Sequence, residues 1–317
     1  MLSAIIPVFN AEKTIALCFD SILKNSFKEF EIIAVDDGST DRSLAIMDKY
    51  ANKSQNIKIL KSNHRGPSAA RNKGAKIARG EILAFLDSDC IVKEDWLENI
   101  SHNFESHNIV AVAGQYNDSY DKGFISRFAL NELLFRERGF GRFMPSGSTC
   151  NFGVKKDIFF SSGGFPEDII AGEDIYLSNQ VSKLGRIMWD KNNGVKHCFK
   201  TTLGGYLKQQ FGYTKNGMRL FIRHPSLAFQ KTLHDKTNYI EIILTGLLLL
   251  SLVAAPFYLT FLLVTAILLA ILAVINTPFL YFLIRRQGSL FALKSLPIII
   301  SRNFSWLLGA FRGIVWD

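Results

Sequence analysis

The chain has 317 residues, 48% of them hydrophobic, and a formal net charge of +9. This length allows one large domain with added elements, or two domains. The lysines and arginines form no run of five or six and many flank an apolar tract, so the charge does not indicate nucleic-acid binding. The four cysteines, Cys18, Cys90, Cys150 and Cys198, have no zinc-site spacing, and we expect them to be free thiols.

Apolar segments and amphipathic segments alternate through residues 2–87. This order predicts βαβ units and a mostly parallel sheet flanked by helices, an α/β fold. Ligands bind such sheets outside the carboxyl ends of the strands. The predicted strands are 2–10, 32–35, 57–60 and 81–87, and the predicted helices are 11–26, 41–53 and 66–80.

The middle of the chain is less regular. Residues 95–105, 124–140, 172–185 and 206–224 are predicted as helices, the last of them amphipathic and suited to a membrane surface. Strands are predicted at 109–116, at the start of 148–165, and as two short strands within 186–199.

An uncharged apolar tract follows at residues 242–284. It is long enough for two spans of about 20 residues, with a turn near Ala255–Phe257. Both flanks are basic, which predicts that both lie on the cytoplasmic side of a cell membrane, together with the N-terminal region. We expect residues 285–317 to form an interfacial helix, because a third span would place Arg302 in the bilayer.

Asp87 and Asp89 directly follow the strand predicted at 81–87. Positions i and i+2 of an extended backbone lie on the same side, so both carboxylates can meet one cation. Hard oxygen ligands in an open site favour Mg²⁺ or Mn²⁺. A solvated loop is the alternative interpretation.

Further candidate residues occur at other strand and helix ends. Asp36 and Asp37 can accept hydrogen bonds from a base or ribose, or form a helix cap and turn. Glu173 and Asp174 can favour a helix start or supply a general base. His197 can be a ligand or an ordinary surface histidine. Neither a G-x-G-x-x-G nor a P-loop sequence is present, which disfavours dinucleotide and P-loop sites.

Four segments together resemble the family-2 glycosyltransferases of the GT-A fold. They are "AIIPVFNAEKTIALCFDSIL", "EIIAVDDGSTDRS", "GPSAARNKGAKIARGEILAFLDSDC" and "GGFPEDIIAGEDIYLSNQVSKLG". The resemblance covers roughly residues 2–200 and implies a Rossmann-like GT-A domain, a nucleotide-diphosphate-sugar donor and a divalent metal.

The resemblance also implies roles for single residues. Asp174 matches the catalytic base, and Asp87 and Asp89 match the metal-binding element, with His197 as a further metal ligand. The donor-binding positions are Pro7, Asn10, Glu12, Asp36, Asp37, Arg71, Asn72 and Asp87, and the acceptor-side positions are Glu173, Gly172 and Asn151.

The Q-x-x-R-W element of processive members is absent, since "KQQFGYTKNGMRLF" lacks Arg-Trp at that spacing. The resemblance therefore implies an inverting, single transfer to a membrane-associated polyprenyl- or lipid-linked acceptor in envelope polysaccharide biosynthesis. A metal-dependent nucleotidyltransferase and a non-catalytic nucleotide-sugar-binding membrane protein are the alternatives.

The expected organisation has four parts. Residues 1–205 form the cytoplasmic catalytic domain and 206–238 an interfacial linker. Residues 239–284 form a two-span transmembrane hairpin, and 285–317 the C-terminal interfacial helix.

Overall fold

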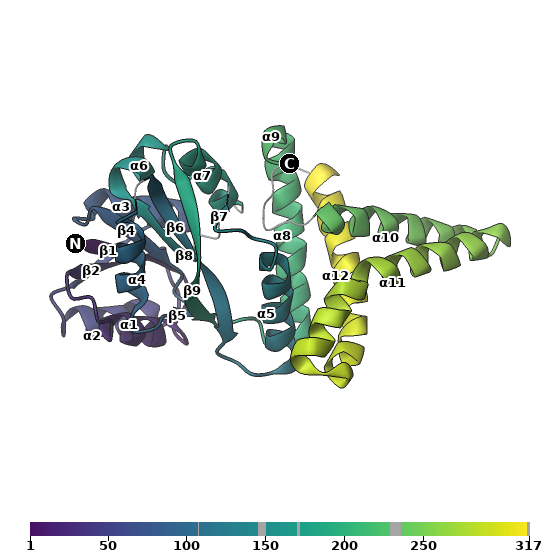
Figure 1. Ribbon diagram of the computed structural model, residues 1–317, viewed down its shortest axis with the longest axis horizontal. Coiled ribbons are helices and arrows are strands. Elements are labelled where there is room, and N and C mark those ends of the chain that lie inside the picture. The colour runs from purple at the N-terminus through teal and green to yellow at the C-terminus, as the bar shows by residue number, and fades with distance from the viewer. Residues whose placement is uncertain (107, 145–149, 170–171, 229–235, 316–317) are drawn as a thin grey trace. The chain divides into compact units, whose positions relative to one another are not determined.

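The computed structural model describes residues 1–106, 108–144, 150–169, 172–228 and 236–315. These residues form two compact units (Figure 1). The sheet unit contains Met1–Lys122 and Gly139–Phe199, and the helical unit contains Gly123–Arg138 and Lys200–Asp317.

A single mixed sheet is the centre of the sheet unit. Its described strands are β1 (Leu2–Val8), β2 (Phe30–Asp36), β3 (Ile57–Lys61), β4 (Ile82–Leu86), β5 (Cys90–Ile91), β6 (Ile109–Ser119), β7 (Phe143–Met144), β8 (Asn151–Lys155) and β9 (Arg186–His197).

The strand order is β3-β2-β1-β4-β8-β6-β9-β5, with β7 paired to β9. The pairings β3–β2, β2–β1 and β1–β4 are parallel, as the alternating pattern predicts. Beyond β4 the sheet is mixed, because β8 pairs antiparallel with both β4 and β6 while β6 and β9 run parallel. The predicted α/β fold class is confirmed.

Helices cover both faces of this sheet. Alternate β1 side chains point to opposite faces: Ile6 packs with α1, α2 and α4, and Ile5 packs with α3, α6 and α7. The helices are α1 (Ile15–Leu23), α2 (Ser43–Ala51), α3 (Pro67–Ile77), α4 (Trp96–Asn103), α6 (Lys156–Ser161) and α7 (Glu173–Ser182).

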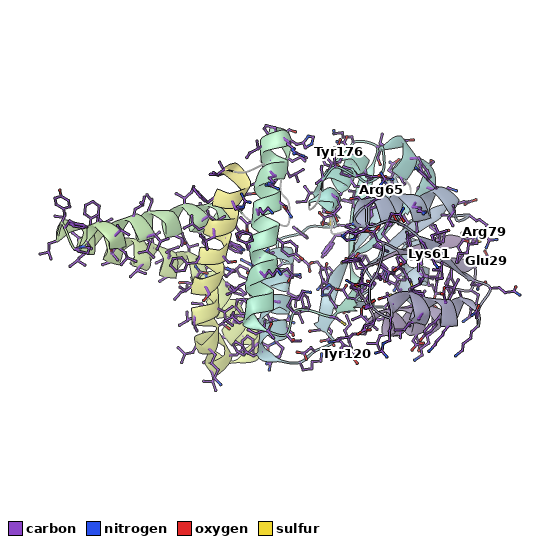
Figure 2. All side chains as sticks on the ribbon, turned by 180° about the vertical axis from the view of Figure 1, so that it is seen from behind. Glu29, Lys61, Arg65, Arg79, Tyr120 and Tyr176 are labelled. Carbon is purple, nitrogen blue, oxygen red and sulfur yellow. The ribbon has the colours of Figure 1, made fainter. Side chains whose placement is uncertain are left out.

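The helical unit contains α5 (Phe124–Glu137), α8 (Leu203–Arg223), α9 (Pro225–Ala228), α10 (Lys236–Ala254), α11 (Thr260–Gln287) and α12 (Ser289–Val315). Two stretches, Thr237–Ala254 and Thr260–Gln287, are long and apolar enough to cross a membrane. Side chains project outward from these helices (Figure 2). Many of the large apolar ones are exposed, including Leu250 at 68% and Leu263 at 67%. The two apolar helices and the turn between them agree with the sequence-based expectation.

A buried network of charged and polar side chains joins four helices of this unit. Arg302 of α12 donates to Glu132 of α5 at 2.7 Å and to Glu241 of α10 at 2.6 Å. The Tyr206 hydroxyl of α8 also donates to Glu132, at 2.8 Å. All four side chains are buried, so each charge depends on its partners for the solvation it loses.

The most marked difference from the sequence-based picture is the placement of residues 123–138. They precede β7 in the chain but cluster with the C-terminal helices, whereas the sequence analysis put them in a domain spanning 1–205. The short elements β5, β7 and α9 were not predicted, and residues 186–197 form one strand instead of two. Residues 229–235 of the expected linker lie outside the described residues.

We predict that Arg302→Met destabilises the chain. The substitution leaves Glu241 buried without its cation and Glu132 with Arg136 alone, and an unpaired buried charge typically costs about 3–5 kcal/mol. Denaturant unfolding in detergent measures the loss. Arg285→Met is the control, because Arg285 is exposed and lies outside the network; an equal loss in both variants would contradict the role of the network.

Candidate active site

The parallel strands β1, β2 and β4 end at the same edge of the sheet. Val8 is opposite Asp36 in the β1–β2 pairing, and β4 ends at Leu86, just before Asp87. Pro7 is buried in β1 opposite Val35. The β1–β4 pairing ends at Ile5, so the missing amide hydrogen of Pro7 falls beyond that ladder. The site is built from the loops that follow these strands.

Hydrogen bonds of Asn10 and Glu12 connect the loop after β1 to the loop after β2. Asn10 has a left-handed backbone (φ 50°), and its Oδ1 accepts from Thr40 N at 2.9 Å. The backbone N–H of Asn10 donates to Ser39 Oγ at 3.0 Å. Glu12 Oε2 accepts from Arg42 N at 3.3 Å. The structure therefore places Asn10 and Glu12 beside the loop that follows Asp36 and Asp37.

Asp36 and Asp37 are both buried and have different partners. Asp36 Oδ1 accepts from Ser39 N at 3.3 Å, which closes the turn after β2. The two Asp37 oxygens accept from Arg65 N at 2.9 Å and Gly66 N at 2.7 Å. Asp37 thus fixes the loop that leads into α3, the helix that carries Arg71.

Arg71 bridges two acids from different parts of the chain. Its Nη2 donates to Asp87 Oδ1 at 2.7 Å and its Nη1 to Glu173 Oε1 at 3.0 Å. The side chain is 5% exposed and its guanidinium lies 5.1 Å from the centre of the Phe165 ring. Although burial opposes it, the carboxylates of Asp87 and Glu173 raise the pKa of Arg71 above its ordinary value. The bridge joins the strand end of β4 to the start of α7.

Asp174 lies beside this bridge in the first turn of α7. Its Oδ1 accepts from Ile175 N at 2.8 Å. Burial, followed by the neighbouring Glu173 carboxylate, raises the pKa of Asp174 to about 7, while Ile175 N and Arg71 act in the opposite direction. Gly172 precedes the helix with φ 90°, a backbone conformation that favours glycine. A carboxyl group that titrates near neutral pH is suited to proton transfer.

Asn72 holds a loop instead of reaching into the site. Its Oδ1 accepts from Phe165 N at 2.9 Å and its Nδ2 donates to Phe165 O at 2.8 Å. Glu167 of the same loop accepts from Asn72 Nδ2 at 3.1 Å and from Arg65 Nη2 at 2.7 Å. These contacts keep Phe165 in place over Arg71.

Asp89 meets His197 because β5 pairs antiparallel with the end of β9. The pair Cys90↔His197 sets the register, and His197 Nε2 lies 3.3 Å from Asp89 Oδ1. The expected extended backbone between Asp87 and Asp89 is wrong. Residues 88 and 89 form a turn, closed by Cys90 N donating to Asp87 O at 3.0 Å. The two carboxylates therefore have different partners: Asp87 pairs with Arg71 and Asp89 with His197.

Asp89, Cys90 and His197 offer ligand atoms within 4.8 Å of one another. Burial, and then the neighbouring Cys150 thiol, raise the pKa of Cys90 well above its ordinary value. Hard cations such as Mg²⁺ and Mn²⁺ also prefer oxygen and nitrogen ligands to sulfur, so Asp89 and His197 are the better ligands of the three. The carboxylate and imidazole that remain fit Mn²⁺ better than the softer metals that thiolates select.

Asn151 is buried in β8, where its amide supports the sheet. Its Oδ1 accepts from Trp96 Nε1 at 2.8 Å and its Nδ2 donates to Asn193 O at 2.7 Å. A Cβ on Gly114 would come within 2.1 Å of Asn151 Nδ2, so glycine is required there. The hydrogen bonds of Asn151 do not link it to Glu173 or Asp174.

The structure therefore brings the sequence-predicted residues together in two clusters, Asp87 with Arg71, Glu173 and Asp174, and Asp89 with His197. Sequence reasoning missed Arg65, Phe165 and Glu167, which brace Arg71 and Asn72. The only sequence signal for them is the Gly-Gly turn before Phe165, which marks a loop without revealing its contacts.

The mixed sheet, its helices and its acidic strand ends define a GT-A fold. The family model "Glycosyl transferase family 2" matches residues 3–165, just over half of the chain. The chain belongs to this family.

Three similar proteins illustrate the relationship. Glycosyltransferase GlyG of Streptococcus pneumoniae is 30% identical over 197 residues, covering 56% of this chain and 65% of that protein. A poly(ribitol-phosphate) beta-glucosyltransferase of Bacillus spizizenii is 40% identical over 111 residues, covering 34% of this chain and 17% of that protein. The chain thus spans less than two thirds of the length of either relative.

A solved structure with the same fold is the mannosyltransferase PcManGT of Pyrobaculum calidifontis, in complex with GDP-Man and Mn²⁺. Its TM-score is 0.66 at 17% identity, and the match covers 99% of this chain and 87% of that one.

We predict that Arg71→Met raises the pKa of Asp174 above about 7. Removing the cation disfavours the carboxylate form of nearby acids. The measurement is a ¹³C NMR titration of the Asp174 carboxyl, assigned with Asp174→Asn. Arg79→Met serves as the control, because Arg79 is paired with Glu31 and is mostly exposed. An unchanged or lower Asp174 pKa in Arg71→Met would contradict the electrostatic link.

Proposed function

We propose that this chain is a glycosyltransferase that moves a sugar from a nucleoside-diphosphate donor to a membrane-associated, polyprenyl- or lipid-linked acceptor. The observation that carries the proposal is the Arg71 bridge. It joins Asp87, on the donor side of the family pattern, to Glu173, which neighbours Asp174 on the acceptor side. One buried cation thus links the two halves that a transfer reaction requires.

Asp174 acts as the general base in this proposal. An acceptor hydroxyl loses its proton to the Asp174 carboxylate while its oxygen attacks the anomeric carbon and the nucleoside diphosphate leaves. Such a base typically contributes about 10²–10⁴-fold to the rate. A single base acting on an attacking hydroxyl predicts inversion at the anomeric carbon. The pKa of about 7 supports this role, because the group can accept a proton near neutral pH.

The donor lies at the strand ends in this proposal. Asp36 accepts hydrogen bonds from the nucleoside, and Asn10, Glu12 and Asp37 shape the loops around it. Asp89 and His197 hold Mg²⁺ or Mn²⁺, with Asp87 beside them. When bound, the cation supplies neutralising charge for the leaving diphosphate. Arg71 orients Asp87 through their 2.7 Å contact.

The exposed apolar surfaces of α10 and α11 support a cell-membrane location with two spans. The basic residues on both flanks favour a cytoplasmic sheet unit. A lipid-linked acceptor would then meet the enzyme at the membrane surface. The similarity to a poly(ribitol-phosphate) glucosyltransferase supports a role in envelope glycan synthesis, and the missing Q-x-x-R-W element supports a single transfer.

We predict that Asp174→Asn lowers the transfer rate by about 10²–10⁴-fold while donor binding persists. In the wild type, kcat/KM should reach a plateau above pH 7 and fall below the Asp174 pKa of about 7, because the protonated acid cannot accept a proton. Steady-state transfer assays over a pH series measure both effects.

Asp157→Asn is the matched control, since Asp157 is exposed in α6 and should leave the rate and the pH profile unchanged. Retention of near wild-type transfer by Asp174→Asn would show that Asp174 is not the base. Retained donor binding without transfer in the wild type would instead favour the non-catalytic alternative.

We predict that Asp89→Asn and His197→Gln each weaken Mn²⁺ binding by about tenfold or more. Cys90→Ser should have little effect, because Mn²⁺ prefers oxygen and nitrogen ligands to sulfur. The electron paramagnetic resonance signal of free Mn²⁺ gives the affinity of each variant. Equal weakening by Cys90→Ser would contradict the oxygen–nitrogen ligand set.

A further inference from the structure

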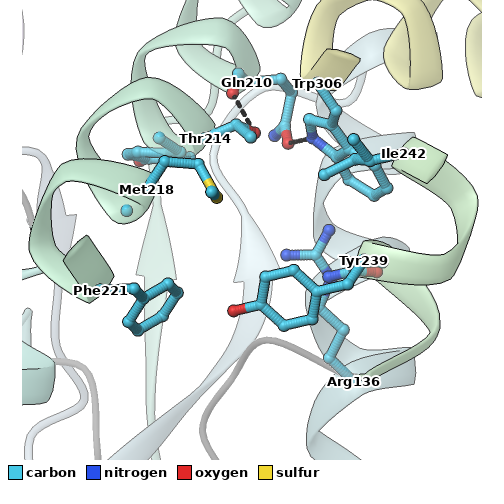
Figure 3. A pocket seen from close by; sticks show the side chains of 11 residues that line it. Arg136, Gln210, Thr214, Met218, Phe221, Tyr239, Ile242 and Trp306 are labelled. Atoms are coloured by element: carbon cyan, nitrogen blue, oxygen red, sulfur yellow. Dashed lines mark hydrogen bonds between the residues drawn. The ribbon is translucent and has the colours of Figure 1, made fainter. Parts of the chain in front are cut away.

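A pocket within the helical unit is lined by four helices and has no role in the proposed transfer chemistry. Its walls come from α5, α8, α10 and α12 (Figure 3). The polar part contains Arg136, Gln210 and Tyr239, and the apolar part contains Met218, Phe221 and Ile242. The pocket is therefore amphipathic, with polar and apolar side chains facing the same space.

Arg136 and Tyr239 bring hydrogen-bond donors to this pocket that no hydrogen bond uses within the described parts of the chain, although Arg136 is ion-paired with Glu132. The side chains of Arg136 and Tyr239 reach into the pocket (Figure 3), and within the described parts of the chain neither makes a hydrogen bond. Arg136 is 13% exposed, and its Nη2 is buried without a hydrogen-bond partner. A guanidinium carries five N–H donors, and leaving buried donors unsatisfied is costly. An oxyanion entering the pocket would satisfy both side chains.

The carboxylate that is nearest to Arg136 is already shared. Arg136 Nη2 lies 3.1 Å from Glu132 Oε1, but Arg302 contacts the same oxygen at 2.7 Å and Tyr206 donates to the other one. Arg136 also lies 5.6 Å from the centre of the Trp306 ring. The presence of Glu132 disfavours a doubly charged ligand, since like charges repel at short range. A singly charged oxyanion fits best.

The apolar walls indicate what the anion is attached to. The rings of Phe221 and Tyr239 lie 6.1 Å apart, and Met218 and Ile242 line the same space. Ile242 belongs to α10, whose neighbouring side chains Ile243 and Leu247 are 62% and 47% exposed. An amphiphile drawn from a bilayer around α10 would present an anionic head and an apolar body to such walls.

We propose that this pocket binds the phosphodiester head group of an anionic membrane phospholipid. Arg136 N–H and Tyr239 O–H donate to the phosphate oxygens, and Met218, Phe221 and Ile242 contact the adjoining glycerol and acyl chain. The proposal rests on the membrane location proposed above and not on glycosyl transfer.

Gly217 provides a substitution that blocks the pocket without disturbing Arg136. It lines the pocket, and a Cβ there would meet no atom within 4 Å. Gly217→Leu should therefore fill the space and also favour the α8 helix. Gly212→Leu is the matched control, because Gly212 lies in the same helix with equally open surroundings but does not line the pocket.

The experiment uses the full chain in a neutral detergent, without any sugar donor. Dioctanoyl phosphatidylglycerol is titrated, and binding is followed by native mass spectrometry and by the midpoint of thermal unfolding. We expect saturable binding of one lipid to the wild type and to Gly212→Leu. Gly217→Leu and Arg136→Gln should each bind about tenfold more weakly or worse.

Two results with the variants would overturn the proposal: equal binding by Gly217→Leu and the wild type, or equal losses of binding in Gly217→Leu and Gly212→Leu. Equal binding of uncharged dioctanoylglycerol would overturn it by showing that the pocket does not recognise the anion. Equal stabilisation by glycerol phosphate would overturn it by showing that the pocket does not recognise the lipid chain. Since no donor is present, the test is independent of whether Asp174 catalyses transfer.

Discussion

The sheet unit depends on one buried guanidinium. Arg71 lies on the small-residue helix α3 and holds Asp87 and Glu173, which are 86 positions apart in the chain. Burying such a cation is favourable only when its partners restore the solvation that it loses. Asp37 and Asn72 serve this arrangement from opposite sides, because one fixes the loop before α3 and the other fixes the loop that bears Phe165. The shape of the site follows from this pairing.

The helical unit uses the same principle with different residues. Arg302 lies between Glu132 of α5 and Glu241 of α10, so here too the two acids come from separate elements of the chain. A buried arginine in salt bridges is a specific connector, because its planar guanidinium donates to carboxylate oxygens only in defined directions. A Cβ on Gly309 or Gly313 of α12 would come within 2.6 Å of the α8 backbone, so this close packing and the charge network together fix one register. Each unit is therefore aligned by a cation shared between two acids.

Much of this was predictable from sequence. The spacing of apolar residues and the turn residues between them predicted β1–β4. Because the carboxyl ends of parallel strands meet at one edge of the sheet, the sequence also predicted that Asp36 and Asp87 lie at that edge. The Asp89–His197 contact depends on β5, a two-residue strand that carries no periodic signal. The buried role of Arg71 was hidden for another reason: a charged residue in a polar helix is ordinarily read as exposed. Tertiary pairing decided both cases, and a single sequence does not reveal it.

The insertion of α5 has a consequence for how the chain acquires its structure. The backbone leaves the sheet unit at Gly123, forms one helix of the other unit, and returns at Gly139. During synthesis, α5 emerges before α10 and α12, the helices that supply Glu241 and Arg302. Glu132 therefore has only Arg136 of its own helix beside it until the last helix supplies Arg302, although domains usually fold in order from the N-terminus. No single peptide-bond cleavage separates the two units, so proteolytic dissection would leave each with a foreign or missing segment.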